Sequence, residues 1–156
     1  EINGTLRSGD FQGTVTVNSS GTVSFVAASS ATPFQSWIAG YPSITAADDQ
    51  LASADPDHDG LNNLTEFLLG GNPSVASASI APTITDAGDH LVFSFTRSVA
   101  AGADSSTTAV VQYSTDLSTW TNVETTSTTA GEKLVNIPKS NAVDGKLFSR
   151  LKVSQP

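Results

Sequence analysis

The chain contains no cysteine, so neither a disulfide nor thiol chemistry can contribute to its fold or activity. It also has few basic residues: seven lysines and arginines stand against fifteen aspartates and glutamates, for a formal net charge of -8. Nucleic acids and anionic membranes bind clusters of basic side chains, and the few present here are scattered. The composition therefore argues against both kinds of partner.

Long apolar runs are absent too, so the sequence predicts no segment inserted in a membrane. Charged residues make up only 14 % of the chain, which is dominated by serine, threonine, alanine, glycine and valine. That composition is typical of exported bacterial β proteins. Because the chain starts at Glu1 and shows no signal peptide, we expect a processed fragment of a longer extracellular or cell-surface protein.

The most specific pattern lies at residues 55–66, DPDHDGLNNLTE, which match the twelve-residue calcium loop D-x-D-x-D-G-x5-E. Calcium takes several oxygen ligands, which a loop can supply only at fixed offsets. Gly60 stands where such a loop turns sharply and leaves no room for a Cβ. The predicted ligands of this Ca²⁺ ion are the side chains of Asp55, Asp57, Asp59, Asn63 (directly or through a water) and Glu66, and the backbone carbonyl of Leu61.

The pattern differs from an EF-hand in two respects. A polar connection, residues 42–54, separates the loop from the helix predicted before it, and Asn62 replaces the apolar residue that pairs two EF-hand loops. No second loop of this kind occurs in the sequence. We therefore expect an unpaired site with a dissociation constant on the order of 0.1–1 mM, as in extracellular modules.

The N-terminal residues predict a β-hairpin. Residues 11–17 and 22–26 alternate apolar with small polar side chains, and residues 18–21, NSSG, have the composition of a turn. Two strands cannot bury a core by themselves. The hairpin must therefore end a preceding repeat region or pack on the rest of this chain or on a neighbour.

Two short amphipathic helices are predicted around the calcium loop. Residues 32–35, TPFQ, form a capping box with proline at the first helical position. The apolar face of this first helix carries Phe34, Trp37, Ile38 and Tyr41. Leu61, Leu64 and Leu68 share a face of the second helix, which residues 70–73, GGNP, end. We expect Trp37 to pack near these leucines.

The remaining residues predict a strand-rich domain. Short alternating segments separated by turn residues are typical of a β-sandwich of immunoglobulin or fibronectin III type, with Trp120 as a core residue. The expected strands are 83–85, 91–97, 108–114, 120–125, 133–137 and 147–153. The predicted fold is therefore mainly β. Its expected parts are a hairpin at 1–30, a helical calcium-loop module at 31–73, a linker at 74–81 and the sandwich at 82–156.

Three blocks of residues carry a resemblance to a known group of proteins. They are residues 34–38, residues 55–67 with 70–73, and residues 111–120 followed by 147–153. In combination they resemble the C-terminal region of large exported proteins of Verrucomicrobia that carry autotransporter-associated β-strand repeats. The acidic block alone also resembles thrombospondin type 3 and dockerin calcium loops. The resemblance implies a surface location and a β-solenoid upstream, and no defined activity.

No catalytic residues are predicted, and we expect the chain not to be an enzyme. His58 takes a non-ligand position of the calcium loop, where it should face solvent, and His90 has the context of a turn residue. No G-x-S-x-G or comparable nucleophile motif occurs. Carboxylates outside the calcium loop stand in turns or on exposed strands, where solubilising and turn-forming roles explain them.

Three functions fit these observations. The first is a non-catalytic, calcium-stabilised structural module that caps a repeat array of a bacterial surface or secreted protein, with neighbouring repeats or subunits as partners. The second is a surface-fibre subunit that self-assembles by strand addition. The third is a carbohydrate-binding accessory domain for a cell-surface glycan, for which Phe93, Phe95, Tyr113 and Trp120 are the candidate aromatics. Core packing explains those aromatics more simply.

Overall fold

The chain forms two compact units, Glu1–Ala31 and Thr32–Pro156. A computed structural model describes residues 13–27, 31–125 and 129–156. Its strands and few short helices confirm a mainly β chain. No helix among the described residues is long and apolar enough to cross a membrane. The further division of residues 31–156 into module, linker and sandwich stays a prediction.

The first unit contains the predicted hairpin. Strands β1 (Gly13–Val17) and β2 (Val23–Ala27) run antiparallel, with Val17 opposite Val23. Asn18 shapes the turn, because its Oδ1 accepts hydrogen bonds from the backbone N–H of Ser20 at 3.1 Å and of Thr22 at 2.9 Å. The turn therefore forms where the sequence predicts it, while residues 11 and 12 of the expected first strand lie outside the described residues.

The second unit opens with the predicted capping box. Helix α1 (Pro33–Ile38) starts after Thr32, whose Oγ1 accepts from the Gln35 N–H at 3.1 Å. The Gln35 side chain in return accepts from the Thr32 N–H at 2.9 Å. Both bonds satisfy donors that a helix N-terminus otherwise leaves free. The buried face holds Phe34 and Ile38, as the spacing predicts.

Helix α2 (Asn63–Leu69) follows the acidic loop and is almost entirely buried. Asn62 caps it by accepting from the Thr65 N–H at 2.9 Å, and Gly70, at φ +85°, ends it. The Trp37 ring lies 5.4 Å from that of Phe67, in the core that also holds Leu64 and Leu68. The expected packing of Trp37 near the leucines is confirmed. The described residues also form three 3-10 turns: Asp48–Gln50, Ala78–Ile80 and Lys139–Asn141.

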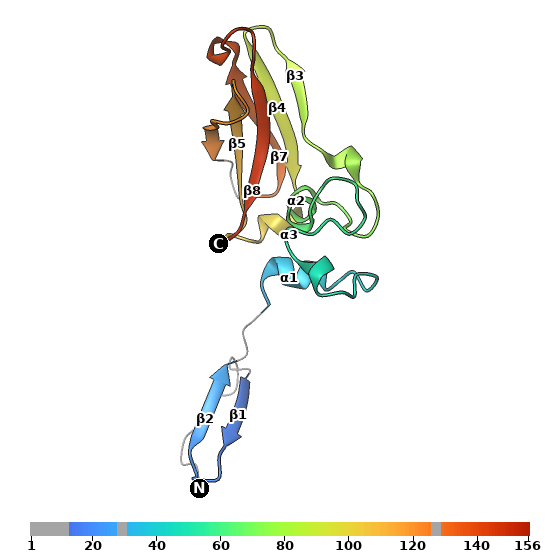
Figure 1. Ribbon diagram of the computed structural model, residues 1–156, viewed down its shortest axis with the longest axis vertical. Coiled ribbons are helices and arrows are strands. Elements are labelled where there is room, and N and C mark those ends of the chain that lie inside the picture. The colour runs from blue at the N-terminus through green and yellow to red at the C-terminus, as the bar shows by residue number, and fades with distance from the viewer. Residues whose placement is uncertain (1–12, 28–30, 126–128) are drawn as a thin grey trace. The chain divides into compact units, whose positions relative to one another are not determined.

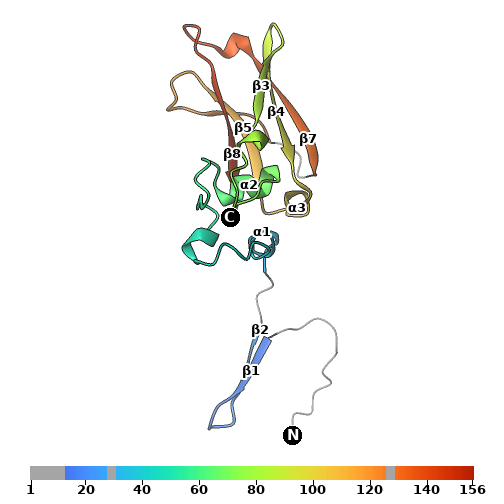
Figure 2. The ribbon, with the colours of Figure 1, turned by 90° about the vertical axis from the view of Figure 1, so that its right-hand side faces the viewer.

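Two antiparallel three-stranded sheets make up the rest of this unit (Figures 1 and 2). One has the order β3-β4-β7 and the other β6-β5-β8. The strands are β3 (Thr83–Asp86), β4 (His90–Arg97), β5 (Thr108–Ser114), β6 (Thr121–Thr125), β7 (Gly131–Pro138) and β8 (Phe148–Ser154). All the strands expected after residue 82 are present, with their ends shifted by at most two residues.

Side chains from both sheets and from the helices share one core. Phe93 and Val135, opposite each other in the first sheet, and Val111 of the second sheet are buried there together with Phe67. Trp120 does not belong to this core, so its expected role is wrong. It lies just before β6, where the exposed Arg150 guanidinium stacks 3.9 Å from its ring centroid. The cation–π contact supplies an alternative to burial.

A third helix, α3 (Val99–Gly102), lies between β4 and β5, where the sequence predicts only turn residues. Ser98 caps this helix by accepting from the Ala101 N–H at 3.0 Å. Its hydroxyl also donates to the Phe67 carbonyl at 2.7 Å, and its backbone N–H donates to the Leu68 carbonyl at 2.8 Å. Ser98 thus joins the end of β4 to the last turn of α2.

We expect Ser98→Ala to lower the free energy of unfolding by about 1–2 kcal/mol, because it removes a helix cap and leaves the Phe67 carbonyl without its donor. Urea denaturation measures the change. Ser140→Ala, at an exposed serine, is the matched control and should change stability by less than about 0.5 kcal/mol. Equal effects of the two substitutions would contradict the role of Ser98.

Candidate metal centre

The three aspartates of the acidic loop converge. One carboxylate oxygen from each of Asp55, Asp57 and Asp59 lies within 4.8 Å of the others. Backbone donors hold these side chains: the Asp59 N–H donates to Asp55 Oδ1 and to Asp57 Oδ1, both at 3.2 Å. The Leu61 N–H donates to Asp59 Oδ1 at 2.8 Å. The loop therefore folds around its own carboxylates, as the sequence pattern predicts.

Two residues of the loop adopt left-handed backbone conformations. Gly60 has φ +90° and His58 has φ +60°. Only glycine takes such angles without steric cost, which explains Gly60 at the sharp turn. His58 is exposed, as expected for its non-ligand position.

Glu66 is the most unusual side chain of the site. It is 0 % exposed, and neither carboxylate oxygen has a hydrogen-bond partner of good geometry. The Ser77 side chain and the Asn72 backbone lie near enough to lower its pKa slightly. Both donors are engaged elsewhere, because the Asn72 N–H donates to Ser77 Oγ at 3.1 Å and Ser77 Oγ donates to the Val75 carbonyl at 2.9 Å. The carboxylate is thus buried without a committed donor.

The surroundings make the charge of Glu66 unfavourable. Burial, and to a smaller extent the charges of Asp57 and Asp59, raise the pKa of its carboxyl to about 7. The backbone of Gly71 packs closely against the carboxylate, since a Cβ at that residue would lie 2.7 Å from Glu66 Oε1. A buried anion beside two more anions calls for a cation.

Two further predicted ligands have unsatisfied buried oxygens. Neither Asp57 Oδ2 nor Asn63 Oδ1 has a hydrogen-bond partner. The Asn63 amide is held in place from its other end, because Nδ2 donates to the carbonyls of Asp49 at 2.7 Å and Leu51 at 2.8 Å. Burial, followed by the neighbouring carboxylates, also raises the pKa of Asp57. The unsatisfied oxygens fall at positions three, nine and twelve of the calcium loop.

The structure therefore supports the predicted ligands to different degrees. It brings Asp55, Asp57 and Asp59 together, and it buries Glu66 near enough to Asp57 and Asp59 to feel their charges. Leu61 lies half-buried within the loop. Sequence reasoning missed one contributor, Ser77, whose N–H donates to Asp59 Oδ2. Ser77 lies beyond the twelve residues of the calcium pattern. The glycines between them predict only the end of a helix.

This arrangement suits a hard cation. Every predicted ligand atom is an oxygen, which is the ligand type that calcium and magnesium prefer. Among the described residues, no lysine or arginine forms an ion pair with the aspartates of the loop or with Glu66. The cluster by itself does not discriminate between divalent ions. Calcium remains the prediction of the sequence pattern.

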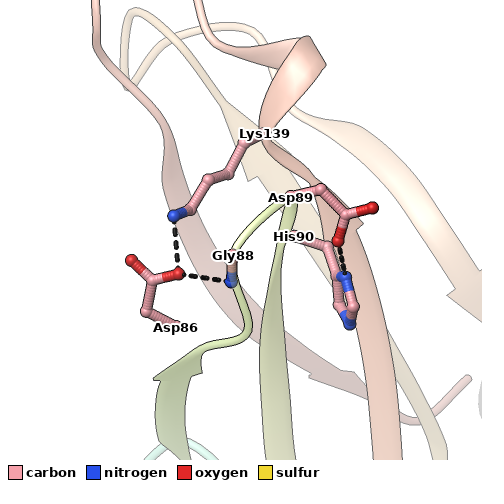
Figure 3. A network of polar contacts seen from close by, with 5 residues as sticks. All are labelled: Asp86, Gly88, Asp89, His90 and Lys139. Carbon is pink, nitrogen blue, oxygen red and sulfur yellow. Dashed lines mark hydrogen bonds and ion pairs between the residues drawn. The ribbon is translucent and has the colours of Figure 1, made fainter.

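A second group of charged residues lies at the β3–β4 turn (Figure 3). Asp86 pairs with Lys139, which is the main reason that the pKa of this carboxyl is lowered. Asp89 pairs with His90, the first residue of β4, and this contact lowers the pKa of Asp89. Both aspartates are exposed. The group is a solvated network beside the turn, and His90, which the sequence predicts as a turn residue, is instead the first residue of β4.

Comparison with known proteins adds no relative. No protein-family model, characterised protein or solved structure matches the chain. The function must therefore be argued from the residues of the chain and their geometry.

We expect Gly60→Ala to lower the free energy of unfolding by about 1–2 kcal/mol. A Cβ at Gly60 would meet no atom within 4 Å, so the cost comes from the backbone conformation alone. His58→Gly is the matched control, because it relieves the same strain at the other left-handed residue and should be neutral or stabilising. Denaturation curves in EDTA compare the two. An unchanged stability of Gly60→Ala would contradict the left-handed turn.

In EDTA, the free energy of unfolding should fall as the pH rises from 4.5 to about 7. The reason is that the pKa of Glu66 is 4.5 in the unfolded chain and about 7 in the folded state. The folded state retains a proton that the unfolded state releases, so the stabilisation is complete below pH 4.5 and lost as the pH passes 7. The loss should reach about 3 kcal/mol, at about 1.4 kcal/mol per pKa unit. Urea denaturation across this interval measures it.

Two variants test the assignment of this pH dependence. Glu66→Gln should abolish the slope, since its side chain does not titrate. Glu132→Gln, which removes an exposed carboxylate on β7, should retain it. A wild-type stability that stays constant between pH 4.5 and 7 in EDTA would show that Glu66 is not buried as described.

Proposed function

We propose that this chain is a non-catalytic structural module, stabilised by calcium, of a bacterial surface or secreted protein. The observation that carries the proposal is the fully buried Glu66 carboxylate, which lacks a committed donor and lies near other carboxylates. A divalent cation would satisfy its oxygens and neutralise the repulsion. Asp55, Asp57, Asp59, Asn63 and Glu66, with the Leu61 carbonyl, would hold this ion.

Such an ion would stabilise more than its loop. The first N–H groups of α2 donate backward, from Asn63 to the Ala54 carbonyl at 2.8 Å and from Leu64 to the Ala52 carbonyl at 3.0 Å. The polar connection before the loop is thereby fastened to the helix that carries Glu66. Because α2 also packs in the common core, cation binding would be coupled to the folding of the whole unit.

A structural role accounts for the site better than catalysis. The carboxylates of the loop point at one another and at backbone N–H groups, and His58 is exposed at the rim. His90 forms part of the solvated turn network. Ser106 and Ser114 donate to the carboxylates of Asp104 and Asp116, and in both pairs the two residues lie two positions apart in the chain, as in turns that such side chains form locally. Local turn formation explains these hydroxyl–carboxylate pairs without a catalytic role.

The two sheets fit the proposed β-sandwich. Their orders, β3-β4-β7 and β6-β5-β8, match strands A-B-E and C′-C-F of an immunoglobulin-like domain. The shared core of Phe93, Val135 and Val111 supports a face-to-face arrangement. In this scheme the module terminates a repeat array.

The proposed location outside the cell rests on composition, on the resemblance to exported repeat proteins, and on the affinity expected of an unpaired loop. A site with a dissociation constant of about 0.1–1 mM fills only where calcium is abundant. Glycan binding has less support, since Arg150 covers a face of Trp120 and the rings of Phe93 and Phe95 are buried. Assembly through strand addition is supported by the edge of β8, which pairs only with β5 among the described strands.

We expect calcium to raise the free energy of unfolding by about 1.4–2.7 kcal/mol at ten to a hundred times its dissociation constant. Thermal or urea denaturation with and without EDTA measures the shift, and calorimetric titration gives the affinity. Glu66→Gln should be insensitive to calcium, whereas Glu132→Gln should respond as the wild type does. A wild type whose stability is the same in EDTA and in millimolar calcium would refute the proposal.

A further inference from the structure

One edge of the β6-β5-β8 sheet is open. Among the described strands, β8 pairs only with β5, so the backbone on its other side has no strand beside it. Leu151 and Val153 of β8 lie opposite Val111 and Ala109, which places them on the core face of the sheet. Both β8 side chains are only half-buried, whereas their partners on β5 are fully buried. The core is thus incompletely covered along β8.

The neighbouring edge of the other sheet shows the same deficiency. Ile84 of β3 lies opposite Phe93 and therefore faces the same side. Phe93 is 3 % exposed, but Ile84 is 52 % exposed. The cover that protects Phe93 does not extend to the edge of the sheet.

A groove runs between these two edges. It is lined chiefly by Leu61, Pro82, Ile84, Phe93, Ser149 and Leu151. Ser149 Oγ is buried and has no hydrogen-bond partner, so the apolar groove also offers one unsatisfied polar atom. An extended peptide suits this combination, because its side chains would cover the apolar wall while its backbone supplies hydrogen bonds.

We propose that the groove binds a strand of the N-terminal hairpin, residues 13–27, from a second copy of this chain. The strand would extend the sheet by pairing with the open edge of β8. This contact joins two different surfaces, so each copy both donates a strand and accepts one. A heterologous contact of this kind produces open-ended chains of subunits unless the rotation closes a ring. This contact would provide the surface for self-assembly by strand addition, and it does not require the acidic loop to bind calcium.

The hairpin has the properties that this partner needs. Its two strands of five residues pair with each other, and an isolated two-stranded hairpin is only marginally stable in water. Val17 and Val23, opposite each other, are both exposed. Residues 13–27 contain no proline, lysine or other charged residue, which are the usual means of protecting a sheet edge from pairing.

Charge also favours this pair of surfaces. Two copies that each carry a formal net charge of -8 repel each other over most of their surface. The hairpin is uncharged, and the only charged residue lining the groove is Arg150. The two surfaces can therefore meet without bringing carboxylates together. The seven residues of β8 provide an edge long enough for either five-residue strand.

Sedimentation velocity of the full chain over a wide concentration range, in calcium and in EDTA, tests the proposal. The wild type should associate as concentration rises. Ile84→Lys should abolish association by placing a charge in the groove, while the matched control Leu134→Lys should retain it. Leu134 is 61 % exposed and lies on β7, at the other edge of the same sheet. Circular dichroism checks that both variants are folded.

A mixing experiment identifies the two surfaces. Val23→Lys should impair the hairpin and leave the groove intact, so that this variant alone stays monomeric. Mixed with Ile84→Lys, which retains its hairpin, it should form a one-to-one complex that grows no further. A wild type that is monomeric at every concentration would overturn the proposal. So would association of Ile84→Lys like that of the wild type, or failure of the two variants to combine. Calcium-dependent stability without association would overturn it while leaving the metal site in place.

Discussion

The burial of one carboxylate, that of Glu66, constrains much of the larger unit. The next residues of α2, Phe67 and Leu68, are fully buried in the core, so the helix cannot rotate to expose Glu66 without losing them. Hydrophobic packing thus holds an anion out of water and near two aspartates, at an electrostatic cost that a cation would offset. The packing of α2 in the core therefore affects the stability of the acidic loop and of the segment around Ser77.

The opposite end of α2 links this site to the sheets. Ser98 binds the last turn of α2 through two hydrogen bonds and caps α3 with a third. The preceding residue, Arg97, is buried, and its guanidinium donates to the Ala101 carbonyl at 2.9 Å and the Thr107 carbonyl at 2.8 Å. These bonds hold the segment that leads into β5. A polar framework therefore continues from the helices to the start of the second sheet.

Local signals in the sequence predicted most elements, and distant contacts account for what they missed. The capping box before α1, the Gly70 stop and the strand alternation each depend on neighbours a few residues away. By contrast, α3 forms because Ser98 meets Phe67, thirty-one residues earlier in the chain. Trp120 stays outside the core because Arg150, on another strand, stacks on its ring. Likewise, the acidic pattern predicted the convergence of the aspartates but could not reveal the bond from Ser77 to Asp59.

The two fixed ends of α2 also restrict how this chain can change in evolution. Inserting or deleting one residue in an α-helix rotates everything beyond it by about 100°. Such a change between Glu66 and Leu68 would turn either the carboxylate away from the aspartates or the last carbonyls away from Ser98. The length of this helix should therefore be nearly invariant among homologues, while exposed turns such as residues 18–21 can accept insertions and deletions.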